Sequence, residues 1–304
     1  MNGDMGEQTR CGFIAILGAP NAGKSTLVNQ LVGTKVSIVS SKVQTTRTRV
    51  LGIAMAGDAQ LIFIDTPGIF APKRRLERAM VSAAWTGAAE ADLVALVIDA
   101  SRPRDEEVAD ILEKLKQRGR DTILILNKID LITPRDKLLA LAGEFDATGL
   151  FSKIFMVSAQ KGDGVSDLIT YFAGIVPSGP WMFPEDQVSD MPQRLLAAEI
   201  TREKVFMHLH QELPYSIAVE TESWQERDDG SVRIDQVVYV LRDGQKPIVL
   251  GKGGRQIRQI GAEARAELEQ LLERTVHLFL HVKVRENWTE QRGHYRDIGL
   301  DYDA

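Results

Sequence analysis

The sequence predicts an α/β protein: a mostly parallel sheet with helices on both faces, followed by a smaller α+β domain. Apolar runs typical of buried strands alternate with helical patterns over the first half of the chain. Three prolines between positions 177 and 184 then interrupt this pattern, and 304 residues are enough for two domains. We therefore expect a first domain over residues 10–178, a linker over 179–190, a second domain over 191–288 and a tail over 289–304.

The first strand leads into a phosphate-binding pattern. The apolar run over residues 13–17 is followed by a segment with the spacing G-x-x-x-x-G-K-[ST], which is the P-loop. Gly18 and Gly23 let backbone N–H groups converge on phosphate oxygens at the start of a helix. Lys24 is expected to reach the outer phosphates, and Ser25 to bind Mg²⁺. The whole loop is predicted to bind nucleotide, namely Gly18, Ala19, Pro20, Asn21, Ala22, Gly23, Lys24, Ser25 and Thr26.

Two strands come next, over residues 49–56 and 60–64, and the Gly57-Asp58 pair between them is typical of a hairpin. The second strand ends beside the P-loop, where Asp65 can hold the Mg²⁺ shell and Gly68 lets a backbone N–H approach the terminal phosphate. We assign four residues here to the nucleotide site, Asp65, Thr66, Pro67 and Gly68.

The later strands of the first domain carry a base-reading pattern. Helices are expected over residues 76–90, 105–118, 134–147 and 165–173, and buried strands over 93–99, 122–126 and 154–157. Guanine presents N1–H and a 2-amino group as adjacent donors, which the Asp130 carboxylate can accept together. Adenine would leave that carboxylate unpaired, so the predicted nucleotide is GTP or GDP. The expected base-binding residues are Asn127, Lys128, Asp130, Ser158, Ala159 and Gln160.

Residues 12 to about 176 resemble the translation-factor-like class of small GTPases. The resemblance implies a switch segment near residues 43–49, in which Thr45 or Thr46 completes the Mg²⁺ shell in the GTP state. Ile69 stands where many such enzymes carry a water-orienting Gln. In some members with a hydrophobic residue there, an Asn matching Asn21 binds K⁺. We expect slow hydrolysis without a general base, with catalytic residues Asn21, Lys24, Thr45, Thr46 and Gly68, and with Mg²⁺ ligands Ser25, Thr45, Thr46 and Asp65.

The second domain reads as helix, strand, strand, short helix, glycine loop, helix and strand. The main elements are expected over residues 193–211, 215–222, 232–241 and 276–284, with a helix after the loop. This order resembles a KH domain of the type found mainly in bacteria. In that module a Gly-x-x-Gly loop contacts about four nucleotides of single-stranded RNA. Residues 242–265 hold six basic against two acidic residues. The implied RNA-binding residues are Gly251, Lys252, Gly253, Gly254, Arg255 and Arg258.

The succession of these two domains, with Gln44-Thr45-Thr46-Arg47 in the switch, resembles the Era family of GTPases from about residue 10 to residue 286. The family implies binding to the 3′ end of 16S ribosomal RNA and a role in maturing the 30S subunit. It implies Mg²⁺, with K⁺ in some relatives, and a cytoplasmic protein that is sometimes peripheral at the inner membrane. We expect a monomer.

Composition alone argues against an RNA partner, because a net charge of −5 does not suggest a protein that binds nucleic acid. The single cysteine, Cys11, indicates a reducing compartment. Two other functions stay open: a constitutive RNA-binding protein with a passive G domain, and a GTPase for tRNA modification or membrane signalling. Trp85 and Trp181 are interpreted as packing residues, and the tail is expected to be partly ordered at best.

Overall fold

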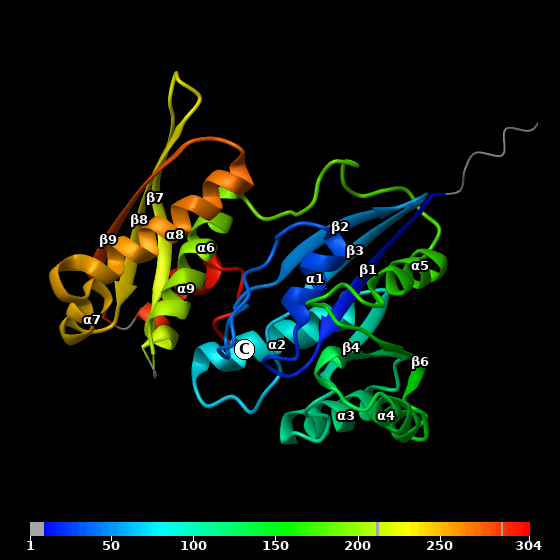
Figure 1. The fold of residues 1–304 in the computed structure, drawn as a ribbon. Helices are drawn as coiled ribbons and strands as arrows, with labels where there is room; N and C mark the ends of the chain where they lie inside the picture. The colour runs from blue at the N-terminus through cyan, green and yellow to red at the C-terminus, as the bar shows by residue number, and fades with distance from the viewer. Residues whose placement is uncertain (1–8, 211–212, 287) are drawn as a thin grey trace, which may run out of the picture. The chain divides into compact units, whose positions relative to one another are not determined.

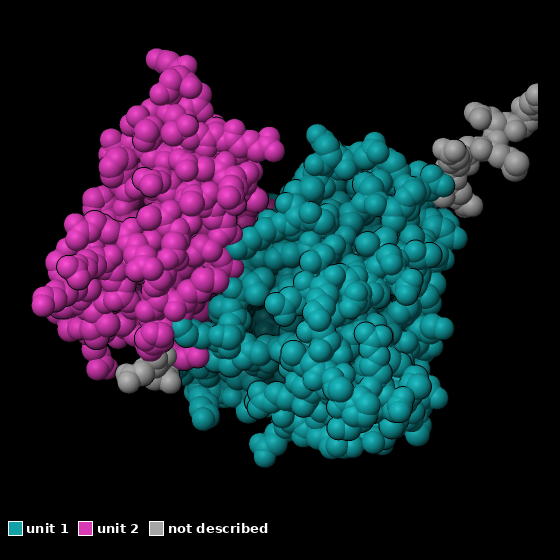
Figure 2. All heavy atoms as spheres, viewed as in Figure 1, with its two compact units in different colours: residues 1–190, 298–304 teal, residues 191–297 magenta. Residues whose placement is uncertain are grey.

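The computed structural model describes residues 9–210, 213–286 and 288–304. The chain divides into two compact units, one of Met1–Asp190 together with Ile298–Ala304 and the other of Met191–Asp297 (Figure 2). Within the described ranges, no helix combines the length and the apolar composition needed to cross a bilayer.

The first unit is built on a six-stranded sheet in the order β2-β3-β1-β4-β5-β6. Its strands run parallel except β2, which pairs antiparallel with β3 across the predicted hairpin. The strands are β1 (Arg10–Leu17), β2 (Val50–Ala56), β3 (Ala59–Asp65), β4 (Leu93–Asp99), β5 (Thr122–Asn127) and β6 (Phe151–Met156). The helices are α1 (Lys24–Val32), α2 (Arg75–Glu90), α3 (Glu106–Arg118), α4 (Asp136–Asp146) and α5 (Val165–Ile175).

Helices cover both faces of this sheet (Figure 1). Along β1 the side chains alternate between the faces: Ala15 and Leu17 pack with α2, α3 and α4, whereas Ile14 and Ile16 pack with α1 and α5. All four are fully buried, as the continuous apolar run of a central parallel strand predicts. The predicted α/β class is therefore confirmed.

Residues 179–190, predicted to be a linker, pack along the edge of this sheet and belong to the first unit. The Ile53 N–H donates to the Val188 carbonyl at 2.9 Å, and Ser189 Oγ donates to the Leu51 carbonyl at 2.7 Å. Because β2 is an edge strand, its outer N–H and C=O groups need partners. Residues 188 and 189 supply these partners. This explains why the segment packs against the sheet, although the sequence predicted a linker.

The second unit holds a three-stranded sheet in the order β7-β8-β9, with β7 antiparallel and β9 parallel to β8. Buried side chains of α6 and α8, among them Ile200 and Ala264, pack with the sheet. Its elements are α6 (Gln193–His208), β7 (Ala218–Glu226), β8 (Val232–Val240), α7 (Lys246–Leu250), α8 (Arg255–Leu272), β9 (Val276–Val284) and α9 (Arg292–Asp297). This is the predicted α+β order.

Several boundaries of the second unit differ from the prediction: β7 runs on to Glu226 and β8 ends at Val240, and two further differences have a local cause. The helix expected over 193–211 ends at His208, and Gln211 lies outside the described residues. The strand expected from Tyr215 begins at Ala218, because Pro214 opens a 3₁₀ turn over Pro214–Ser216. A proline fixes its own φ and has no N–H, so it favours such a turn over the sheet ladder.

The predicted tail, 289–304, is more ordered than expected, and the residue before it helps to explain why. Trp288 is fully buried and its indole N–H donates to the Ser216 carbonyl at 3.1 Å. Tyr295 on α9 is also fully buried. In the first unit, the guanidinium of Arg75 lies 4.3 Å from the ring centre of Tyr302. These aromatic side chains fix a segment whose charged composition suggested disorder.

Candidate functional site

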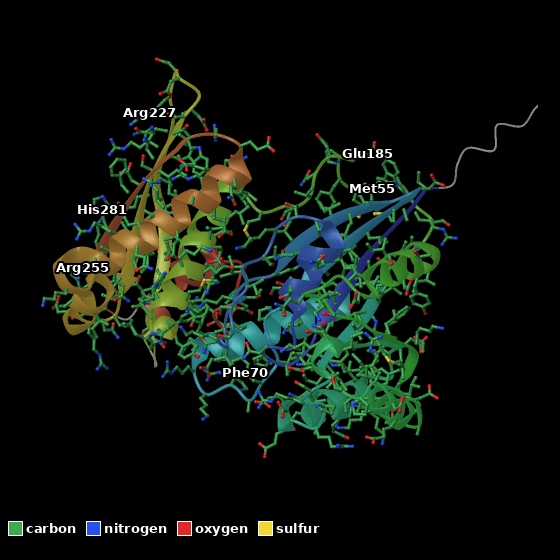
Figure 3. All side chains as sticks on the ribbon, viewed as in Figure 1. Met55, Phe70, Glu185, Arg227, Arg255 and His281 are labelled. Carbon is green, nitrogen blue, oxygen red and sulfur yellow. The ribbon has the colours of Figure 1, made fainter. Side chains whose placement is uncertain are left out.

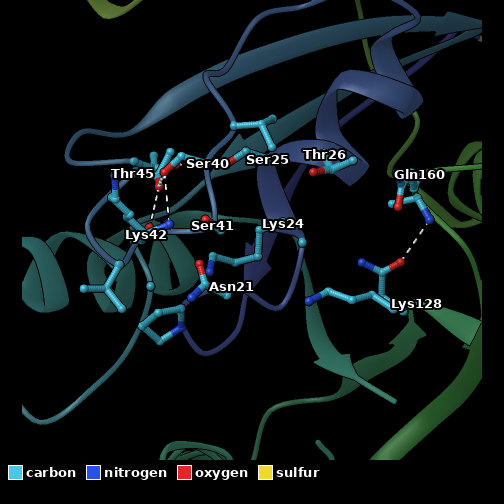
Figure 4. A pocket seen from close by; sticks show the side chains of 18 of the residues that line it. Asn21, Lys24, Ser25, Thr26, Ser40, Ser41, Lys42, Thr45, Lys128 and Gln160 are labelled. Atoms are coloured by element: carbon cyan, nitrogen blue, oxygen red, sulfur yellow. Dashed lines mark hydrogen bonds between the residues drawn. The ribbon is translucent and has the colours of Figure 1, made fainter. Parts of the chain in front are cut away.

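The carboxyl ends of the parallel strands surround a pocket of about 560 Å³ in the first unit (Figure 4). This is the edge at which ligands bind in open α/β sheets. The described residues that line it come from the P-loop, the segment over residues 38–46, the loop after β3 and the two loops after β5 and β6 that were predicted to bind the base. They include Asn21, Lys24, Ser25, Thr45, Thr46, Gly68, Asn127, Lys128, Asp130, Ala159 and Gln160.

Two glycines of the P-loop have no room for a side chain. A Cβ on Gly18, whose φ is +153°, would lie 2.4 Å from the Val97 carbonyl oxygen. A Cβ on Gly23, whose φ is +94°, would lie 2.3 Å from Nδ2 of Asn127. Gly23 is also the residue before α1, so the backbone N–H groups of this helix start face the pocket region. The loop therefore has the backbone conformation that a phosphate cradle requires.

Lys24 is almost fully buried, with 6% of its surface exposed. Its Nζ donates to the carbonyls of Gly18 and Ala19 at 3.1 and 2.9 Å. Burial lowers the pKa of Lys24 to about 8, although the negative charge of Asp65 opposes this change. A partly desolvated cation at the base of the loop is suited to bind phosphate oxygens.

Three oxygen-bearing side chains meet beside Lys24. Ser25 Oγ lies 2.8 Å from Asp65 Oδ2 and 2.9 Å from Thr46 Oγ1, and Thr46 Oγ1 donates to the same carboxylate oxygen at 3.2 Å. Asp65 is fully buried, which raises its pKa, while the hydrogen bond from Ser25 acts in the opposite direction. Its other oxygen, Oδ1, has no hydrogen-bond partner among the described residues.

The two candidate threonines of the switch segment, Thr45 and Thr46, have different hydrogen-bond partners in the structure. Thr46 joins Ser25 and Asp65, whereas Thr45 Oγ1 lies 2.6 Å from Ser40 Oγ and donates to the Lys42 carbonyl at 2.6 Å (Figure 4). Both line the pocket, but only Thr46 belongs to the oxygen cluster.

The base-reading loops are connected to each other and to the P-loop. Asn127 donates to the Ala22 carbonyl at 2.9 Å and accepts from the Ala159 N–H at 2.9 Å. Ser158 Oγ donates to Asp130 Oδ1 at 2.6 Å. Asn127 is thus a structural link between three loops, and Asp130 is held at the pocket edge.

Asp99 is a residue that the motif analysis missed. At the end of β4, its carboxylate accepts a 2.6 Å bond from Lys128 Nζ, which fixes the side chain of this pocket-lining residue. Burial alone would raise the pKa of Asp99, but the bonds from Lys128 and Ser101 outweigh it and the pKa lies below its usual value. The sequence signal was available: a carboxylate at the end of a buried strand, as for Asp65.

The loop after β3 carries no water-orienting side chain next to Gly68. Ile69 is only 1% exposed, packs in the core with α2, and donates its N–H to the Gly18 carbonyl at 3.1 Å. A Cβ on Gly68 would lie 3.0 Å from Pro20, so this loop and the P-loop are in close contact. Thr66 Oγ1 donates to the Ile16 carbonyl at 2.7 Å, so its side chain also fixes this loop against β1. Phe70 follows on the same loop (Figure 3).

In the second unit, the GKGG loop between α7 and α8 contains three glycines at positive φ. A Cβ on Gly251 would lie 2.7 Å from the Cβ of Gln256, whereas the positions at Gly253 and Gly254 are open. Lys252 and Arg255 are exposed (Figure 3 labels Arg255). Arg258 donates to the Gly253 carbonyl at 2.6 Å, so it supports the loop.

Comparison with protein families divides the chain in the same way. Residues 13–128 match the model of the 50S ribosome-binding GTPases, and residues 212–289 match the KH domain. Three curated proteins called GTPase Era are similar along nearly their whole length. The protein from Bradyrhizobium sp. (strain ORS 278) is 56% identical, covering 97% of this chain and 95% of its own. That from Brucella suis is 57% identical, covering 97% and 94%, and that from Caulobacter vibrioides is 55% identical, covering 99% of both.

Two solved structures are similar over 96% of this chain and 99% of theirs, each with a TM-score of 0.91 and 40% identity. One is Era in complex with MgGDPNP and nucleotides 1506–1542 of 16S ribosomal RNA. The other is a variant of Aquifex aeolicus Era bound to GDP and AlF₄⁻. The resemblance predicted from the motifs is confirmed, and the chain, a P-loop G domain followed by a KH domain, belongs to the GTPase Era family.

Proposed function

We propose that this GTPase uses its nucleotide state to control binding to the 3′ end of 16S ribosomal RNA, and thereby assists maturation of the 30S subunit. The observation that carries the proposal is the presence, in one chain, of the Ser25–Thr46–Asp65 oxygen cluster and the exposed GKGG loop. The similar Era structure that contains both MgGDPNP and 16S nucleotides supports it.

The oxygen cluster fits Mg²⁺. Mg²⁺ prefers hard oxygen ligands, and Asp65 offers a buried carboxylate oxygen without a hydrogen-bond partner among the described residues. Ser25 and Thr46 would be direct ligands, with Asp65 holding the shell, and Thr45 would have a structural role in the switch. The ion would supply neutralisation of charge on the phosphates during hydrolysis.

Catalysis by the protein's own groups would then rest on positioning. Lys24 would hold the outer phosphates, and the Gly68 backbone would approach the terminal one. Ile69 is apolar and buried in the core, so its side chain has no group that could orient the attacking water. Asn21 lines the pocket and is exposed, so its side-chain oxygen would be the group that binds K⁺. Hydrolysis should then be faster in K⁺ than in Na⁺, and Asn21→Ala should abolish that difference.

The RNA site would be the GKGG loop. Gly253 and Gly254 have open space where a side chain would stand, so an RNA backbone can approach closely there. Lys252 and Arg255 add exposed positive charge. Arg258 would act partly by supporting the loop through Gly253, since a guanidinium has five N–H donors and can bind a phosphate as well.

The test is a double variant, Lys252→Asp with Gly253→Asp. Two carboxylates at this loop would repel phosphates, so affinity for a single-stranded RNA of the 16S 3′ end should fall at least about tenfold, measured by fluorescence anisotropy. The matched control is Lys153→Asp with Gly143→Asp, the same charge change at exposed positions of the first unit. Unchanged RNA affinity in the loop variant, with GTP binding intact, would show that RNA binds elsewhere.

We also propose that the protein acts in the cytoplasm as a monomer. The peripheral contact with the inner membrane implied by the family is tested by fractionating cells and by sedimentation with vesicles. Recovery with the vesicles would support that contact.

A further inference from the structure

One carboxylate, that of Glu77, contacts both the switch segment and the start of α2. Its Oε2 accepts bonds from the N–H groups of Lys73 and Arg74 at 2.7 and 3.0 Å, and so it caps the start of α2. Its Oε1 accepts a bond from Nε2 of Gln44 at 3.0 Å. Glu77 and Gln44 are each only 9% exposed, so this bond is shielded from water. A shielded bond to a charged group is stronger than one at the surface.

Gln44 lies two residues before Thr46, in the switch segment. Its φ is +59°, a left-handed conformation that is uncommon for residues other than glycine. Such a conformation costs free energy and persists only where surrounding contacts hold it. The bond to Glu77 is one of those contacts, and it fixes the backbone that presents Thr46 to Ser25 and Asp65.

The other end of the contact is the first turn of α2, the first helix after the Asp65–Gly68 motif. We propose that Glu77 is a positioning residue for GTP binding: it ties the switch segment to the start of α2, so that Thr46 reaches its place beside Ser25 and Asp65 only when that helix start is ordered. This rests on the role proposed for Thr46 in binding Mg²⁺. Of the two partners, Gln44 lines the pocket, and Glu77 is not among the described residues that line it.

The hydrogen-bond polarity provides a sharp test. In Gln44→Glu two carboxylates would face each other in a shielded site, and the contact would become repulsive. Adding Glu77→Gln reverses the polarity: the new amide can donate to Glu at position 44 while its oxygen accepts from the helix N–H groups. The chain shows that an amide can do this, because Gln245 Oε1 accepts from the N–H groups of Leu241 and Arg242 at 2.9 and 3.1 Å.

Affinities for a fluorescent non-hydrolysable GTP analogue and for fluorescent GDP, both with Mg²⁺, are the measurement. Gln44→Glu should lower the affinity for the GTP analogue about tenfold, which is a typical size for the coupling between two groups in contact. It should leave the affinity for GDP within about threefold of the wild type. The double variant should return the GTP-analogue affinity to within about threefold of the wild type. Thermal unfolding without nucleotide reports whether each variant is folded.

The matched control is Gln117→Glu, which places a carboxylate beside Glu113 in an exposed Gln–Glu pair on α3. It should not change the ratio of the two affinities. Thr46→Ala separates this inference from the function on which it rests. If Thr46→Ala leaves the GTP-analogue affinity unchanged, the proposed Mg²⁺ role of Thr46 is wrong. If Thr46→Ala lowers it but Gln44→Glu does not, or if the double variant fails to recover, the positioning role of Glu77 is wrong.

Discussion

Asp130 lies at the pocket edge, where Ser158 donates to one of its carboxylate oxygens at 2.6 Å. Replacing it with Asn would put an amide donor opposite the guanine 2-amino group. Affinity for GTP should fall on the order of 10³-fold or more, and affinity for xanthosine triphosphate, which carries a carbonyl there, should rise. Competition binding measures both, with Asp136→Asn, exposed on α4, as the control. Unaltered GTP affinity would contradict the assignment of this carboxylate.

Lys24 should make nucleotide binding depend on pH. Burial lowers its pKa to about 8 in the structure, and bound phosphates would raise that pKa. Above about pH 8 the free protein has lost this proton and the complex keeps it, so binding takes up a proton and affinity falls as the pH rises. Calorimetry in two buffers of different ionisation enthalpy measures the uptake. Proton uptake by Lys24 on nucleotide binding should be clear near pH 8.5 and absent near pH 6.5. Equal uptake at the two pH values would argue against the lowered pKa of Lys24.

The segment along the edge of β2 should stabilise the first unit. Ser189 Oγ bonds to the Leu51 carbonyl at 2.7 Å, and a hydrogen bond of this kind contributes about 1 kcal/mol. We therefore expect Ser189→Ala to lower the free energy of unfolding by about 1 kcal/mol in urea titrations followed by intrinsic fluorescence. Ser82→Ala, at an exposed position on α2, is the control. A variant as stable as the control would mean that this bond adds nothing measurable to the stability of the unit.

Residues 191–297 should fold by themselves, because the second unit has its own buried clusters around α6, α8 and the three strands. A fragment of this range should show a cooperative thermal transition and bind single-stranded RNA. An unfolded fragment would refute the boundaries of 190/191 and 297/298 that we propose for an independent RNA-binding unit.

For the whole molecule, the affinity for RNA should differ between the GDP and GTP-analogue complexes. A ligand shifts an equilibrium only by its differential binding, so a coupled switch must show such a difference, typically five- to 150-fold. Titration of the 16S 3′-end RNA with each complex decides this. Equal affinities would favour the alternative reading of a constitutive RNA-binding protein with a passive G domain.

Much of this architecture follows from local patterns. The P-loop spacing, the buried strands, the polar motif at the end of each strand and the GKGG loop are all visible in short windows, because each depends on neighbouring residues and backbone geometry. The net charge of −5 argued against a nucleic-acid partner, because it averages the basic region around the GKGG loop with the rest of an acidic chain. The charged composition of the tail suggested little order, but it did not show that Tyr295 within the tail is buried.

What the sequence determined by itself is therefore the two-domain class and the guanine-nucleotide family, whereas RNA binding by the GKGG loop stays a prediction. The tertiary structure alone decided the rest: Thr46 and not Thr45 meets Asp65, the supposed linker completes the edge of β2, and Glu77 contacts Gln44. Each of these depends on a bond between residues 19 to 138 positions apart. Which distant residues come into contact depends on the tertiary fold, and the spacing of residues within a short segment does not determine it.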